Sequence, residues 1–284
     1  MNRRDLLRLT LGAGFGAFAH AGFSRPNARF RIGACDWSIG KTADVAAFEV
    51  ARQIGLDGVQ VSLNTAAKPQ HLQQPAVQRA YLDAARQTGV AIGGLAIGAL
   101  NDVPYKSDPQ TEAWVSDSID VAKALGVQAV LLAFFSKNDL RGDDKGKAEV
   151  VRRLRAVAPK AERAGVTLGI ESYLSAAEHL DIMQRVGSPA VKVYYDFRNS
   201  TDAGYDIYKE IKELGKNNIC ELHIKENGKL LGSGTLDWPR IRRALDDIDY
   251  VGDGWMQLEW SMPNGADVVD AYRHNLTFTR NLFA

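Results

Sequence analysis

The sequence predicts a closed (β/α)₈ barrel, and two observations favour that fold class. First, eight short apolar runs with the character of strands alternate with amphipathic helical segments from about residue 30 to the end of the chain. Strands that alternate with helices pair in parallel through right-handed crossovers, and eight such units close into a barrel. Second, the turn after the first strand, CDWSIGK, lacks the glycine-rich fingerprint typical of an open dinucleotide-binding sheet. An open doubly wound sheet is therefore the less favoured alternative.

Each predicted strand is a short apolar run between helical segments. The runs span residues 29–38, 58–64, 90–98, 127–135, 166–173, 191–197, 219–225 and 255–261. The intervening segments, such as VAAFEVARQIG and VQRAYLDAARQTG, repeat apolar residues at helical spacing, and several end at a glycine that suits a helix C-terminus. No linker rich in proline, glycine or serine follows residue 21. We therefore expect a single barrel domain over residues 22–284.

The first 21 residues predict a cleavable export signal. An Arg-Arg pair at positions 3 and 4 precedes an apolar run over residues 9–19, and Ala19-His20-Ala21 supplies small residues for a signal peptidase. The run is shorter than the roughly 20 residues that a spanning helix needs. RRDLLRL resembles a twin-arginine signal, whose pathway exports folded proteins. We expect a periplasmic or secreted protein that leaves the membrane after cleavage; the alternative is an amphipathic N-terminal helix of a cytosolic protein.

The net charge of the chain indicates which class of binding partner to expect. The chain has 35 Lys and Arg against 34 Asp and Glu, which gives a formal net charge of +1. A near-neutral protein has no broad cationic field to attract nucleic acid or an anionic membrane, so a small-molecule partner is expected. Cys35 and Cys220 are too far apart for a metal knuckle, and we expect both to be small buried side chains.

Four polar residues stand at the C-terminal ends of the last four predicted strands: Glu171 in GIESY, Asp196 in YYDFRN, His223 in ELHIKEN and Glu259 in MQLEWS. Active sites of such barrels lie at this edge of the strands. Taken singly, each residue could be a cap or an ion-pair partner. Three carboxylates and an imidazole on neighbouring strands instead predict a site for one divalent metal ion, Mn²⁺, Mg²⁺ or Co²⁺, with Zn²⁺ also acceptable.

These motifs, together with LLGSGTLDWPRI, stand in an order and spacing that resemble the sugar phosphate isomerase/epimerase family, which has the xylose isomerase-like barrel. The resemblance covers about residues 30–282. It implies that Glu171, Asp196, His223 and Glu259 hold the metal ion. It also implies that the two glutamates exchange protons with the substrate, as they do in the ketose epimerases of that family.

The chemistry of such a site can be stated independently of the family. Removing a proton beside a carbonyl leaves an enediolate, which needs a positive charge close by, and a divalent ion supplies it. Glu171 is expected to remove the proton and Glu259 to return one. Return to the opposite face gives an epimer, and transfer to the adjacent carbon gives an aldose-ketose isomer.

The chain departs from the family pattern at two substrate positions. Asn199 stands where the ketose epimerases have a histidine, and Lys229 stands where they have an arginine. Asparagine still donates and accepts hydrogen bonds, and lysine still offers a point charge, so both stay substrate-binding candidates. The departures weaken any assignment to a particular ketose.

Further candidates follow from their places on the strands. Trp37, at the end of the first strand, is expected to wall the pocket, because sugar rings pack their C–H faces on aromatic rings. Lys225 shares a strand face with His223, and Asn64 ends the second strand, so both are substrate-binding candidates. By the same alternation Trp260 is expected to face the helices, away from Glu259.

The sequence leaves four functions to compare. The favoured one is a metal-dependent isomerase or epimerase of a small sugar or keto-sugar. A metal-dependent lyase or hydratase of keto-sugars or keto-glycosides is the main alternative, and a non-catalytic sugar-binding protein is less favoured. An endonuclease for abasic DNA needs more than the 5 histidines present, and the near-neutral charge also opposes it. His179, adjacent to Glu178 on a predicted helix, is expected to lie at the surface.

Overall fold

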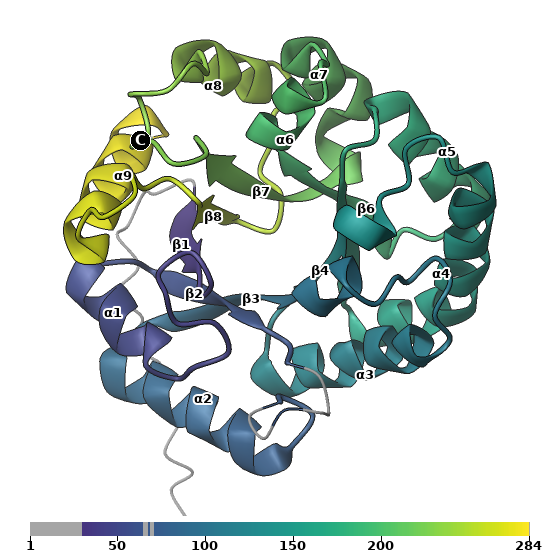
Figure 1. Ribbon diagram of the computed structural model, residues 1–284, viewed down its shortest axis with the longest axis horizontal. Helices are drawn as coiled ribbons and strands as arrows, with labels where there is room; N and C mark the ends of the chain where they lie inside the picture. Colours follow the sequence, from purple (N-terminus) through teal and green to yellow (C-terminus); the bar gives the residue numbers. More distant parts are fainter. Residues whose placement is uncertain (1–29, 65–67, 69–70, 284) are drawn as a thin grey trace, which may run out of the picture.

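The computed structural model describes residues 30–64, 68 and 71–283, and these form a closed barrel of parallel strands inside a ring of helices (Figure 1). The strands are β1 (Arg31–Cys35), β2 (Gly58–Ser62), β3 (Ala91–Ile97), β4 (Ala129–Phe134), β5 (Thr167–Ser172), β6 (Val191–Asp196), β7 (Ile219–Lys225) and β8 (Trp255–Glu259). They pair in chain order, and β8 closes on β1. The predicted fold class and all eight predicted strands are confirmed. The predicted export signal lies outside the described residues.

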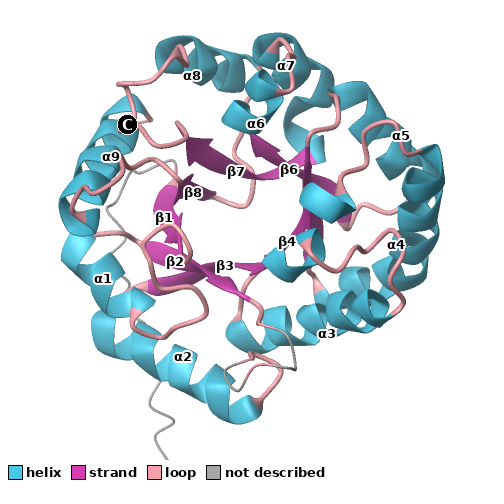
Figure 2. Cartoon of the chain, in the orientation of Figure 1, coloured by secondary structure: helices cyan, strands magenta, loops and turns pink. Residues whose placement is uncertain are grey.

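Helices cover the outside of the barrel, as Figure 2 shows. They are α1 (Ala47–Ile54), α2 (Pro75–Thr88), α3 (Gln110–Leu125), α4 (Asp144–Ala164), α5 (Ala176–Val186), α6 (Phe197–Asp202), α7 (Ile207–Asn218), α8 (Trp238–Asp247) and α9 (Val268–Leu282), with the short 3-10 helices η1 (Gly98–Asn101) and η2 (Ser136–Asn138). Helix α1 shows why these segments are amphipathic, because its buried residues recur at intervals of three and four positions. No helix among the described residues is long and apolar enough to cross a membrane.

The inside of the barrel is unusually polar for a strand interior. The side chains of Gln60, Glu221 and Gln257 are fully buried there, and the Gln257 amide nitrogen donates to Glu221 Oε1 at 2.7 Å. Gly33 on β1 gives this layer room, because a side-chain carbon at that position would collide with the Gln257 amide. A layer of buried polar side chains therefore lies inside the barrel, beneath the C-terminal ends of the strands where a polar site is expected.

One expectation about the helix layer is wrong. His179 on α5 is buried rather than at the surface. Its ring nitrogens lie 2.9 Å from Ser172 Oγ and 3.0 Å from the Ser175 carbonyl oxygen. Ser175 caps α5, so the first turn of the helix folds back over the end of β5 and encloses the imidazole.

Candidate metal centre

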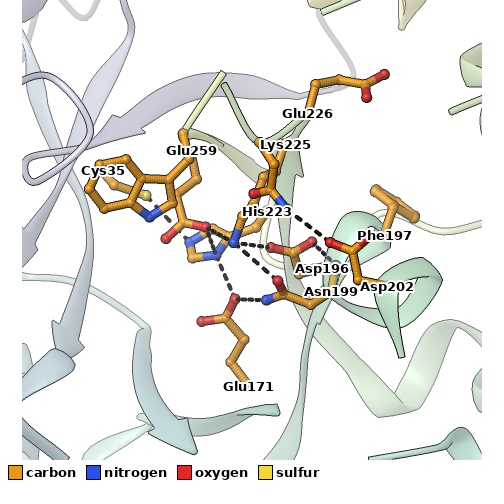
Figure 3. A network of polar contacts seen from close by, with 12 residues as sticks. Cys35, Glu171, Asp196, Phe197, Asn199, Asp202, His223, Lys225, Glu226 and Glu259 are labelled. Carbon is orange, nitrogen blue, oxygen red and sulfur yellow. Dashed lines mark hydrogen bonds and ion pairs between the residues drawn. The ribbon is translucent and has the colours of Figure 1, made fainter. Parts of the chain in front are cut away.

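The four residues predicted at the strand ends come together in one buried cluster (Figure 3). One ligand atom from each of Glu171, Asp196, His223 and Glu259 lies within 4.8 Å of the others. The Nδ1 atom of His223 is 3.0 Å from Glu171 Oε1 and 3.6 Å from Glu259 Oε2. The geometry thus gathers three carboxylates around one ring nitrogen.

Strand register explains why residues so distant in sequence converge. Asp196 on β6 lies opposite His223 on β7, and Lys225 on β7 lies opposite Glu259 on β8. Because parallel strands present their C-terminal ends at the same edge, each of these side chains enters the mouth of the barrel. Asp196 also caps α6, where its carboxylate accepts the Asn199 N–H at 2.8 Å.

Burial and nearby charges shift the pKa values of the ionisable groups in the cluster in different directions. Burial raises the pKa of Glu171 and of Asp196 above their ordinary values. Burial also opposes ionisation of Glu259, but Lys225 and His223 lower its pKa. Burial opposes the charged form of His223, yet the Glu171 carboxylate is the strongest of several groups that raise its pKa well above the usual value. The cluster thus sets three carboxyl groups against two groups that can carry a positive charge, His223 and Lys225.

The donor set fits a divalent cation. The buried Asp196 Oδ2 and Glu259 Oε2 atoms accept no hydrogen bond of good geometry, although Lys225 Nζ lies 3.4 and 2.9 Å from them. Buried carboxylate oxygens without such partners are costly unless a cation coordinates them. Three carboxylates and one imidazole suit Mn²⁺, Mg²⁺ or Co²⁺. The cluster is therefore a candidate site for one such ion.

The second ring nitrogen of His223 faces a residue that sequence reasoning missed. His223 Nε2 lies 2.9 Å from the side-chain oxygen of Gln60 on β2. The Cys35 thiol donates to the same oxygen at 3.1 Å, and the Gln60 amide nitrogen donates to the Tyr194 hydroxyl at 2.9 Å. The only signal in the sequence is a polar glutamine within an apolar strand. An amide oxygen accepts from N–H, so Gln60 favours the tautomer that leaves Nδ1 free for a metal ion.

A cavity of about 590 Å³ opens above the cluster. Glu171 and Glu259 line it, and Asp196 and His223 are not among its described lining residues, although all four are buried. The two glutamates are thus the metal-site residues that face the cavity. Its other lining residues come from the ends of all eight strands and from the loops that follow them: Trp37, Thr42, Ala43, Ser62, Leu63, Asn64, Lys68, Ala96, Gly98, Ala99, Asn101, Leu131, Ala133, Phe135, Tyr173, Asn199, Lys225 and Trp260.

The structure brings four of the five substrate-binding candidates to this cavity. Trp37, Asn64, Asn199 and Lys225 line it. Lys229 is exposed in the loop after β7 and is not among the described lining residues.

Three of these candidates also contact the metal-site residues. The Trp37 indole N–H donates to Glu259 Oε1 at 2.8 Å. The Asn199 amide nitrogen donates to Glu171 Oε1 at 3.2 Å, and its oxygen accepts from Lys225 Nζ at 3.1 Å. Asn199 therefore links a glutamate of the cluster to the lysine.

Trp260 lies differently from what strand alternation predicts, and Asp36 at the same edge is a buried residue that sequence reasoning missed. Trp260 does not face the helices: it lines the cavity and is 50% exposed. Strand β8 ends at Glu259, and Trp260 adopts φ 44°, so the alternation stops one residue earlier. Asp36, which was not singled out, is fully buried and shapes the same edge, because its carboxylate accepts hydrogen bonds from the backbone N–H groups of Ala43 and Ser62.

The chain is similar to one family of TIM barrels and to several curated enzymes. The family model described as "Xylose isomerase-like TIM barrel" matches residues 48–282. A 2-epi-5-epi-valiolone 7-phosphate 2-epimerase of Actinoplanes sp. is 26% identical over 76% of this chain and 80% of its own. A D-psicose 3-epimerase of Enterocloster bolteae is 32% identical over 44% of this chain and 43% of its own. A 3-oxo-isoapionate decarboxylase of Pectobacterium atrosepticum is 26% identical over 58% and 67%.

Solved structures agree on the fold. The D-psicose 3-epimerase of Clostridium cellulolyticum H10, solved with D-tagatose, superposes with a TM-score of 0.75 at 21% identity, over 89% of this chain and 99% of that one. A xylose isomerase-like barrel of Mycobacterium smegmatis, solved in complex with magnesium, gives 0.71 at 15% identity, over 90% and 98%. At such identities these likenesses concern the barrel alone.

Proposed function

Because the chain belongs to the family of xylose isomerase-like TIM barrels, we propose that it is a metal-dependent isomerase or epimerase of a small sugar or keto-sugar. The observation that carries the proposal is the division within the cluster, in which Glu171 and Glu259 face the cavity while Asp196 and His223 lie behind them. Two carboxyl groups at a cavity wall are what proton removal and proton return require. Relatives named as epimerases support the same reaction class.

The four residues would hold the ion through the carboxylates of Glu171, Asp196 and Glu259 and through His223 Nδ1. When bound, a divalent ion neutralises the negative charge that develops on substrate oxygens when a neighbouring C–H proton leaves. Glu171 takes that proton, and the C–H electron pair moves into the carbon–carbon bond while the carbonyl electrons move to oxygen. Glu259, which must enter this step as the protonated acid, then supplies a proton to carbon and the carbonyl reforms. The reverse reaction exchanges the two roles. The raised pKa of Glu171 and the lowered pKa of Glu259 favour this opposite direction, in which the Glu259 carboxylate takes the proton and protonated Glu171 supplies one.

Three neighbours orient the carboxyl groups and the substrate. The hydrogen bond from Trp37 fixes the Glu259 carboxylate, and its indole ring flanks the cavity. Asn199 holds Glu171, and the Lys225 ammonium group lies in the same wall, where it can meet a sugar oxygen. Rigid placement matters because proton transfer needs heavy-atom distances of about 2.6–3.2 Å.

A lyase remains the alternative because the same proton removal can lead to loss of a neighbouring group. One relative is named as a decarboxylase, a class of enzyme that cleaves a carbon–carbon bond. The product separates the two reactions, since an isomer keeps the mass of the substrate and a cleavage product does not.

The test follows solvent deuterium into sugars. Purified protein is loaded with Mn²⁺, its metal content is measured, and a panel of ketoses and keto-glycosides is incubated in heavy water with analysis by mass and NMR. We expect about one bound ion and deuterium at one carbon of at least one substrate of unchanged heavy-atom mass. His223→Ala should lose the ion.

Matched variants separate a role in exchange from a role in folding. Glu171→Gln and Glu259→Gln should each abolish exchange and keep the barrel, as judged by circular dichroism. Glu213→Gln, which changes an exposed glutamate on α7, should exchange at the wild-type rate. Wild-type exchange in either cavity variant would remove that glutamate from the reaction, and absence of both metal and exchange in the wild type would refute the proposal.

A further inference from the structure

The cavity has two unlike halves. Its charged lining residues Glu171, Lys225 and Glu259 come from β5, β7 and β8, where the candidate metal ion lies. The half formed by the ends of β1–β4 and the following loops is lined mainly by small, apolar and uncharged polar residues, and among the described lining residues there only Lys68 is charged. A ligand that fills the whole cavity thus meets charge at one end and an uncharged surface at the other.

Aromatic rings stand on opposite sides of this cavity. Trp260 follows β8 and Phe135 follows β4, and these two strands are diametrically opposed in the closed eight-strand order (Figure 1). Phe135 packs edge-to-face on Tyr173 at 4.8 Å between ring centroids, and Arg141 lies over the other ring of that pair, 4.6 Å from the Tyr173 centroid. These contacts hold the Phe135 side in place, and Trp260 lines the cavity after the opposite strand.

The backbone of Trp260 is held in a costly conformation. A φ of 44° lies in the left-handed region, which a bulky side chain rarely adopts. The Trp260 N–H donates to Ser38 Oγ at 3.2 Å, and its carbonyl accepts from the Gly228 N–H at 2.8 Å. Both neighbouring loops therefore fix the residue, and yet Trp260 is 50% exposed and lines the cavity. Two hydrogen bonds hold the strained backbone of Trp260 although its side chain is half exposed. Ligand binding explains this arrangement better than packing does.

The size of the cavity indicates what that ligand is. A hexose displaces roughly 200 Å³, about six or seven water volumes, so one ring beside the metal site leaves most of the 590 Å³ free. Aromatic walls suit the C–H faces of a second sugar ring. The near absence of charge in that half disfavours a phosphate or a carboxylate there.

We propose that the natural substrate is a glycoside. Its reacting ring lies at Glu171 and Glu259, and its uncharged second sugar ring extends into the half formed by the ends of β1–β4 and stacks on Trp260. This residue follows β8 where that strand pairs with β1, so it lies at the border of the two halves. The inference rests on the proposed function for the place of the reacting ring, and it extends that function by naming the substrate class. Trp260 is the residue that distinguishes such a substrate from a free monosaccharide.

Binding to matched pairs of sugars tests the proposal. Calorimetry on the Mn²⁺-loaded protein compares D-fructose with turanose, lactulose and isomaltulose, which are D-fructose carrying a second hexose at different hydroxyls, and D-glucose with maltose and cellobiose. We expect at least one disaccharide to bind at least tenfold more tightly than its monosaccharide. Trp260→Ala should remove that advantage, and Trp260→Phe, which keeps an aromatic face, should restore most of it. The melting temperature of Trp260→Ala should stay within about 2 °C of wild type.

The outcomes are separable from those of the proposed function. Disaccharides that bind no more tightly than their monosaccharides, or an advantage that survives Trp260→Ala, would overturn the subsite even if deuterium enters a free ketose. A Trp260-dependent advantage in a protein that exchanges no deuterium would keep the subsite and refute the isomerase. A large fall in melting temperature in both Trp260 variants would show that the indole serves packing, and would also overturn the subsite.

Discussion

Replacing Gln60 by methionine tests whether the barrel interior controls the metal site. Methionine has nearly the same length, but it offers no strong acceptor to His223 Nε2, which now lies 2.9 Å from the Gln60 oxygen. Without that acceptor the imidazole can rotate or change tautomer, and Nδ1 then spends less time directed at the three carboxylates. We expect weaker metal binding although none of the four candidate ligands has changed.

The expected size follows from the role of such partners elsewhere. Loss of a hydrogen bond to the outer nitrogen of a metal-bound histidine typically lowers metal affinity about 10- to 100-fold, or roughly 1.4–2.7 kcal/mol. Gln60 is fully buried, and the partner left to Nε2 is the Cys35 sulfur, a weak acceptor 3.4 Å away, so the substitution also costs about 1–3 kcal/mol of folding stability. Titration with Mn²⁺ against a fluorescent chelator measures the affinity, and thermal unfolding of the metal-free protein measures the stability.

Two further variants isolate the histidine contact. Gln60→Glu keeps an oxygen near Nε2 and should bind Mn²⁺ at least as tightly as wild type. Tyr194→Phe removes the hydroxyl that accepts from the Gln60 amide nitrogen and keeps the ring that packs on His223, 4.7 Å between ring centroids. It should therefore lower stability and leave metal affinity within about threefold. Wild-type affinity in Gln60→Met, or an equal loss in Tyr194→Phe, would refute the reasoning.

Three other predictions concern charge and processing. Lys225→Met should tighten Mn²⁺ binding by at least about tenfold, because it removes a cation 2.9 Å from Glu259, and weaker binding in the chelator assay would contradict this. Burial lowers the pKa of His179 to about 4, so between pH 6.5 and 4 the unfolded chain binds more protons than the folded one. The free energy of unfolding should therefore decrease by up to about 3 kcal/mol as the pH is lowered from 6.5 to 4, and urea unfolding should show a smaller decrease for His179→Gln. Mass analysis of protein expressed with its N-terminus intact in a Gram-negative host should find a mature chain that begins near Gly22, and retention of residues 1–21 would oppose export.

The sequence predicts those site residues that can be recognised from their own position in the chain. Glu171, Asp196, His223 and Glu259 each interrupt the end of an apolar run, and the fold class then brings such ends together. Gln60 gives no comparable signal, because its role depends on a histidine that lies 163 positions further along the chain and meets it only across the barrel.

Trp260 and His179 show where local patterns mislead. Alternation places Trp260 outside only if the strand continues, and the strand stops at Glu259. Helical spacing separates His179 from Glu178, but it says nothing of the Ser172 hydroxyl that approaches from the end of β5. In both cases a contact between elements decides the outcome, and periodicity within one element carries no information about that contact.

The division of the cavity bears on how substrate choice is encoded in this chain. Under the proposed function, the cluster of Glu171, Asp196, His223 and Glu259 would hold a metal ion and move a proton on any sugar whose carbonyl reaches it, so it would specify the reaction and not the sugar. Choice must then come from residues that meet the rest of the substrate. Asn199, which joins Glu171 to Lys225, lies beside the reacting carbon, while Trp260 lies at the border between the charged and the uncharged half of the cavity, where β8 pairs with β1. Exchanging Asn199 should therefore change the rate on every substrate, and exchanging Trp260 should change the order of preference among them.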